Sequence, residues 1–64
     1  MYKESDITYE DKDSKFWILK VKKGYEIYKN VGTHSIRKCI VGYDDLDKAI
    51  FWLNYVKEND KTSL

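Results

Sequence analysis

The sequence predicts an α+β domain in which a three- or four-stranded antiparallel sheet packs against one C-terminal helix. Short aromatic and β-branched runs, separated by turns that contain glycine, occupy residues 7–42 and are typical of strands. Apolar residues then recur at helical spacing over residues 44–58. The 64 residues, 42% of them hydrophobic and 16% aromatic, fit one small domain over residues 1–64, with 1–6 frayed and 59–64 as a tail.

The first half of the sheet contains a short strand and a long one. Ile7–Tyr9 alternates apolar and polar residues and predicts an edge strand, which a charged loop over residues 10–15 follows. Phe16–Val21 is the clearest strand, because it is almost entirely aromatic and β-branched. We expect its alternate apolar side chains to face the helix: Trp17, Leu19 and Val21.

A hairpin joins this strand to the next. Lys22-Lys23-Gly24 predicts a three-residue loop closed by a left-handed glycine, which pairs Val21 with Tyr25 and Leu19 with Ile27. In this register Phe16, Ile18 and Tyr28 lie on the outer face of the sheet. A turn over residues 30–33 then leads to a further strand over residues 35–41, whose apolar residues fall on both faces.

The helix has a clear beginning and a clear apolar stripe. Asp44 is expected to be its N-cap, and two further aspartates in the first turn suit the positive end of the helix dipole. The spacing predicts that Phe51 and Tyr55 lie off the buried stripe, whereas Trp52 flanks it. The predicted core combines strand and helix residues: Trp17, Leu19, Val21, Ile27, Leu46, Ala49, Ile50 and Leu53.

The charges are strongly segregated along the chain. Residues 12–38 hold eight basic and two acidic residues, and the rest of the chain holds four basic and nine acidic ones. The net charge of +1 therefore conceals a basic sheet beside an acidic N-terminal tail and an acidic helix. Such segregation indicates a polyanionic or acidic partner.

Several classes of function have no support in the sequence. One histidine and one cysteine cannot supply the four ligands of a structural zinc site, so Cys39 is expected to be a small buried hydrophobe and His34 a turn residue. No phosphate-binding glycine loop or nucleophile–base arrangement is present, so we expect neither an enzyme nor a cofactor. The polar N-terminus and the lack of any apolar run of about 20 residues predict a cytoplasmic protein that does not span a membrane.

Two segments resemble a known group of DNA-binding domains. Lys15–Val21, an aromatic strand, and Lys38–Ala49, a strand followed by glycine, an aromatic residue, a helix cap and an alanine, carry the resemblance. Over residues 15–58 the chain is similar to the arm-type domains of tyrosine recombinases and to the ethylene-response-factor type domains of plants. In both families a three-stranded sheet backed by one helix lies in the major groove. The resemblance implies DNA contacts from four residues: Lys20, Lys22, Arg37 and Lys38.

The leading hypothesis is a small DNA-binding accessory protein, of the kind that phages and mobile elements encode, that uses a basic sheet face. Lysine binds phosphate as a point charge, while arginine can read guanine. The predicted nucleic-acid-binding residues are Lys20, Lys22, Lys23, Tyr28, Lys29, Arg37 and Lys38. The alternatives are a homodimeric structural domain and a protein-binding module, such as an inhibitor of a host factor. The predicted protein-interface residues are Phe16, Ile18, Phe51 and Tyr55.

Overall fold

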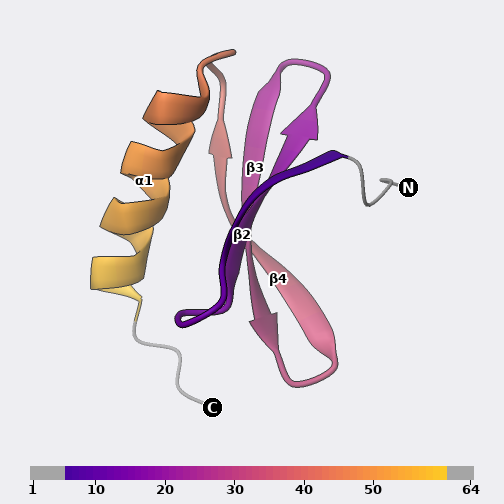
Figure 1. Cartoon of the computed structure of the whole chain (residues 1–64), viewed down its shortest axis with the longest axis vertical. Coiled ribbons are helices and arrows are strands. Elements are labelled where there is room, and N and C mark those ends of the chain that lie inside the picture. The colour runs from indigo at the N-terminus through magenta and orange to yellow at the C-terminus, as the bar shows by residue number, and fades with distance from the viewer. Residues whose placement is uncertain (1–5, 61–64) are drawn as a thin grey trace.

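The computed structural model describes residues 6–60, which form a four-stranded antiparallel sheet and one helix. The strands are β1 (Ile7–Asp11), β2 (Phe16–Val21), β3 (Gly24–Val31) and β4 (His34–Val41), in the spatial order β1-β2-β3-β4, and the helix α1 spans Leu46–Asn59. The helix lies against one face of the sheet, and within residues 6–60 no other helix or strand covers the opposite face (Figure 1). The predicted α+β class is confirmed. The predicted fraying of residues 1–5 and the end of the predicted tail, residues 61–64, lie outside the described residues.

The hairpin between β2 and β3 differs from the predicted one by one residue. The turn has two residues, Lys22 and Lys23, because Gly24 pairs with Val21 as the first residue of β3. A Cβ atom on Gly24 would lie 2.1 Å from the carbonyl oxygen of Val41, and its φ is +137°. Glycine is therefore required here because β4 approaches closely, rather than because it closes a three-residue turn.

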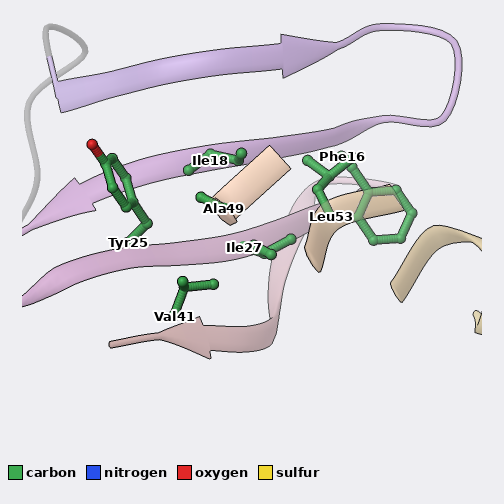
Figure 2. Packing of buried hydrophobic residues seen from close by; sticks show 7 residues of the cluster. All are labelled: Phe16, Ile18, Tyr25, Ile27, Val41, Ala49 and Leu53. Carbon is green, nitrogen blue, oxygen red and sulfur yellow. The ribbon is translucent and has the colours of Figure 1, made fainter. Parts of the chain in front are cut away.

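The corrected register places Ile18 opposite Ile27, where the sequence pattern predicts Leu19. The prediction that Trp17, Leu19 and Val21 face the helix is therefore wrong. The core beneath the helix consists of residues from three strands and the helix (Figure 2): Phe16, Ile18, Tyr25, Ile27, Val41, Ala49 and Leu53. Phe16 and Ile18, predicted to be an outer interface, are 2% and 0% exposed. Phe16–Leu19 is apolar on both sides of the strand, so periodicity alone does not determine which side faces the helix.

The helix agrees closely with its predicted stripe. Ala49 and Leu53 are fully buried, and three neighbouring residues pack partly buried against the core: Leu46, Ile50 and Val56. The N-cap, however, is Asp45 rather than Asp44, because the Asp45 carboxylate accepts the Asp47 backbone N–H at 3.0 Å. This leaves the Asp44 side chain available for a partner on the sheet.

A bulge divides the second hairpin. β3 and β4 join through the two-residue turn Gly32-Thr33, so β4 begins at His34 rather than at the predicted residue 35. Along β4 the pairing passes from Arg37 opposite Tyr28 directly to Cys39 opposite Ile27, which leaves Lys38 as the extra residue. Arg37 consequently lies on the open face of the sheet. Cys39 packs against the core, but it is half-buried rather than buried as predicted.

Candidate functional site

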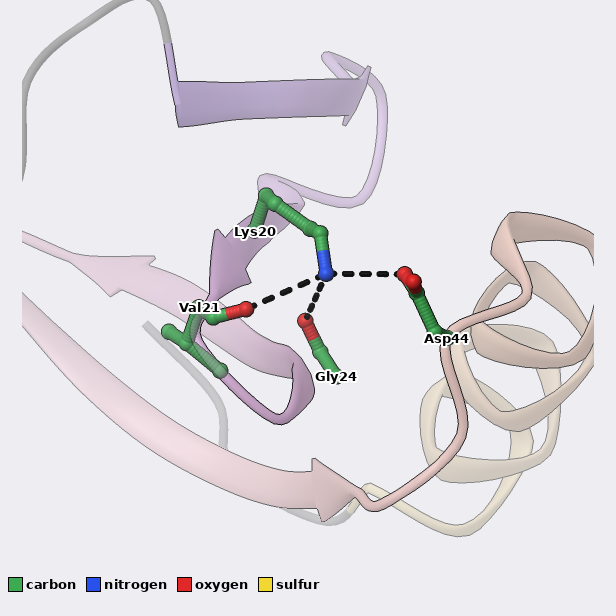
Figure 3. A network of polar contacts seen from close by, with 4 residues as sticks. All are labelled: Lys20, Val21, Gly24 and Asp44. Carbon is green, nitrogen blue, oxygen red and sulfur yellow. Dashed lines mark hydrogen bonds and ion pairs between the residues drawn. The ribbon is translucent and has the colours of Figure 1, made fainter.

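The predicted DNA-binding cations do not form one basic face. Lys20 extends toward the start of the helix, where its Nζ lies 2.8 Å from the Asp44 carboxylate (Figure 3). The same ammonium donates to the Val21 and Gly24 carbonyl oxygens at 3.1 and 3.4 Å and lies over the Tyr25 ring. Lys20 therefore fastens the β2–β3 hairpin to the segment that precedes α1.

Lys29 and Lys38 fasten the opposite end of the helix. Both ammonium groups reach the carboxylate of Asp60, the C-cap residue, at distances of 2.6 Å from Lys29 and 3.1 Å from Lys38. The Lys29 and Asp60 side chains are only 10% and 7% exposed, so this pair lies within the protein. Lysines near a helix C-terminus also suit the negative end of the helix dipole.

Arg37 and Tyr28 lie together on the open face of the sheet. The Glu26 carboxylate accepts the Tyr28 hydroxyl at 2.8 Å and pairs with the Arg37 guanidinium at 3.2 Å. Tyr28 also stacks on Trp17, with ring centroids 4.6 Å apart. Trp17 in turn donates its indole N–H to Asn30, so the apolar side chains on this face are held in place by polar contacts.

Lys22 and Lys23 alone among the predicted cations have no ion pair within residues 6–60. They form the tip of the β2–β3 turn and are exposed. The other four, Lys20, Lys29, Arg37 and Lys38, all pair with carboxylates of the chain itself. The charge segregation seen in the sequence thus corresponds largely to attraction between the sheet and the two ends of the helix.

A fifth ion pair fixes one side of the helix to β1. Lys57 donates to the Asp11 carboxylate at 2.9 Å. This hydrogen bond holds the pKa of Asp11 below its ordinary value and raises the pKa of Lys57 above its own. Since Lys57 and Trp52 are about 140° apart around the helix, Trp52 lies on a different side of α1 from the one that contacts β1.

The aromatic residues of α1 form the clearest exposed apolar surface. Phe51 and Tyr55 are 65% and 53% exposed, which confirms the prediction that they lie off the buried stripe. Trp52, 38% exposed, meets both rings edge to face, with centroid distances of 5.8 Å to Phe51 and 5.6 Å to Tyr55. We call Phe51, Trp52 and Tyr55 the aromatic strip.

Two charged residues border the aromatic strip along the helix axis. Lys48 precedes Phe51 by three residues and Glu58 follows Tyr55 by three, and both are exposed. Lys48 lies over the exposed ring of Tyr43, 4.4 Å from its centroid. Lys48 and Glu58 are not among the predicted site residues, although their spacing from the two aromatics is the signal that would identify them.

Other kinds of site find little support in the described part of the chain. No group of three or more His, Cys, Asp or Glu side chains within residues 6–60 is placed to hold a metal ion. A hollow of about 290 Å³ lies beside Trp17 and Asn30, at the lower limit of ordinary ligand pockets. Nor is the helix at residues 46–59 long and apolar enough to cross a membrane.

Comparison with known proteins does not extend this picture. No protein-family model, curated protein or solved structure matches the chain. The candidate function therefore follows from the surface described above.

Proposed function

We propose that this protein is a non-enzymatic protein-interaction module that docks through the aromatic strip of α1. The observation that carries the proposal is the exposure of Phe51, Trp52 and Tyr55, at 65%, 38% and 53%, as one contiguous edge-to-face cluster. Large aromatic side chains dominate the binding energy of protein interfaces, whereas isolated exposed apolar residues are common and carry no such meaning.

The size of the strip agrees with this role. At about 200 Å² for each aromatic side chain, the exposed fractions amount to roughly 300 Å². The largest apolar patch on a monomeric protein is typically about 300–600 Å² and is often functional. Because Trp52 contacts both neighbouring rings, the strip is already ordered before binding, which reduces the entropy lost on association.

Helical placement defines the mode of docking. Phe51 and Tyr55 are four residues apart and therefore project from the same side of α1. Anchors at this spacing are typical of helices that lie along an apolar groove or against another helix. The helix itself is held at both ends and along one side by ion pairs, so it presents the strip from a fixed position.

Site-specific photo-crosslinking tests the proposal. With p-benzoylphenylalanine at position 51, we expect a protein adduct in the producing cells, and we expect its loss when Tyr55→Ala is added. The same group at position 23, on the exposed hairpin tip, is the matched control and should give no such adduct. Equal adducts from positions 51 and 23, or none from position 51, would contradict the proposal.

Duplex DNA is the second candidate partner. Lys22 and Lys23 favour it, because they are exposed cations that no carboxylate within the described residues neutralises. Fluorescence anisotropy with a random-sequence duplex, at salt concentrations from about 50 to 200 mM, measures phosphate contacts directly. Binding that weakens steeply with salt and is lost on Lys22→Ala/Lys23→Ala supports a DNA partner; no binding at the lowest salt rejects it.

A further inference from the structure

We infer that the partner of the aromatic strip is a second copy of this chain, with the two α1 helices packed antiparallel across a twofold axis. This inference rests on the proposed function and names the occupant of the same surface. The exposed face of α1 is complementary to itself when one copy is turned end for end. That complementarity involves charges as well as aromatic rings.

The exposed face of α1 carries a narrow line of side chains that runs along the helix. Since successive helical residues are rotated by about 100°, four exposed side chains fall within an arc of about 80°: Lys48, Phe51, Tyr55 and Glu58. Their spacings of three, four and three residues are those of the a and d positions of two heptads. We call these four residues the outer seam.

The outer seam is symmetric about Leu53. Lys48 and Glu58 are each five residues from Leu53, and Phe51 and Tyr55 are each two residues from it. An antiparallel pair centred at Leu53 therefore places Lys48 of each copy beside Glu58 of the other. It also places Phe51 of each copy beside Tyr55 of the other. A parallel pair would instead place lysine beside lysine and glutamate beside glutamate, which is unfavourable.

The flanks of the seam obey the same symmetry. In an antiparallel pair each flank meets the same flank of the other copy, so Trp52, one residue from Leu53, comes close to Trp52 of the other copy. On the opposite flank, the neutral Asn54 of one copy comes close to Asn54 of the other.

The area of the contact sets its strength. Two aromatic strips contribute roughly 600 Å², and stable interfaces bury about 1,200–2,000 Å² in total. The surrounding polar side chains of α1 add to this area, but the helix is only 14 residues long. The dimer should therefore be weak, with a dissociation constant of micromolar order or weaker.

Charge exchange within the seam gives a sharp test. Lys48→Glu leaves two acidic seam residues on each copy, and Glu58→Lys leaves two basic ones. In sedimentation velocity from about 20 µM to 1 mM, a range suited to weak association, each variant should self-associate at least about threefold more weakly than the wild type. An equimolar mixture of the two variants should associate at least as tightly as the wild type.

Matched controls separate the seam from net charge and folding. Lys22→Glu and Glu10→Lys make the same charge changes at exposed sites away from α1, and they should leave self-association unchanged. Phe51→Ala/Tyr55→Ala should weaken association at least about tenfold, because aromatic anchors carry most of the energy of such contacts. A wild type that stays monomeric, or a mixture of variants no tighter than either variant alone, would overturn the inference.

The outcomes also distinguish the two proposals. If the wild type stays monomeric while position 51 crosslinks to a different protein, the second copy is rejected and the proposed function stands. If p-benzoylphenylalanine at position 51 gives no adduct, and the Lys48→Glu and Glu58→Lys variants associate no more tightly together than alone, both proposals are rejected.

Discussion

Replacing Asp60 by asparagine should destabilise the protein severely, although Asp60 lies in no strand and beyond the last helical residue. Its carboxylate meets Lys29 at 2.6 Å and Lys38 at 3.1 Å, and both Lys29 and Asp60 have side chains no more than 10% exposed. Removing one member of a buried ion pair costs about 3–5 kcal/mol, because the remaining charge stays buried. A domain of 64 residues has a total stability of roughly 3–10 kcal/mol.

Urea denaturation followed by tryptophan fluorescence measures this loss. We expect Asp60→Asn to remove about 3 kcal/mol or more, and adding Lys29→Met should recover part of it because the more deeply buried of the two ammonium groups is then removed. Asp44→Asn is the matched control: its pair with Lys20 is exposed, at 77% for the Asp44 side chain, so the loss should be at most about 1 kcal/mol. Equal, small losses for both variants would refute the assignment of Asp60 as a buried anchor.

Two further predictions concern the other attachment of the helix and the hairpin. The lowered pKa of Asp11 means that its pairing with Lys57 stabilises the fold above pH 3.8 and is lost as the pH falls through the folded-state pKa. Unfolding curves of the wild type and Lys57→Met should therefore differ at pH 7 and converge in acid; a constant difference would contradict this. Gly24→Ala should cost at least about 2 kcal/mol in urea denaturation, because the new Cβ meets the Val41 carbonyl oxygen at 2.1 Å and φ is positive. A loss below about 0.5 kcal/mol would show that β4 lies further away.

The helix and its exposed aromatics could be predicted because one period determines both. Leu46, Ala49 and Leu53 recur at helical spacing, and the same spacing places Phe51 and Tyr55 on the opposite side. No comparable constraint acts on β2. Its apolar residues lie on both faces, so either face could cover the core, and the register of the hairpin decides between them.

The register of this hairpin depends on Gly24, whose place in the sequence fits two structural roles. In Lys22-Lys23-Gly24, the glycine is expected equally in a three-residue turn and at a close approach between strands. The close approach involves Val41, which is 17 residues away, so no local pattern reveals it. A shift of one residue then exchanges Leu19 for Ile18 opposite Ile27 and reverses the predicted faces.

The ion pairs could not be predicted for a similar reason: their partners are far apart in the sequence. Lys29 and Asp60 are 31 residues apart, and Lys20 and Asp44 are 24 apart. Composition shows that residues 12–38 are basic and residues 44–60 acidic, but it does not tell whether these charges face each other or a partner. The folded arrangement brings them together, which leaves the aromatic strip as the more distinctive surface.

A concentration series of ¹⁵N–¹H correlation spectra is the most direct test of the outer face of α1 as the interaction surface. From about 20 µM to 1 mM, a range suited to weak association, we expect progressive shifts at residues 47–59 and at their side-chain amides, with β2 and the hairpin tip unchanged. The shifts should disappear in Phe51→Ala/Tyr55→Ala. Shifts centred on Lys22, Lys23 and Arg37, or none anywhere, would contradict the account of a self-complementary helix.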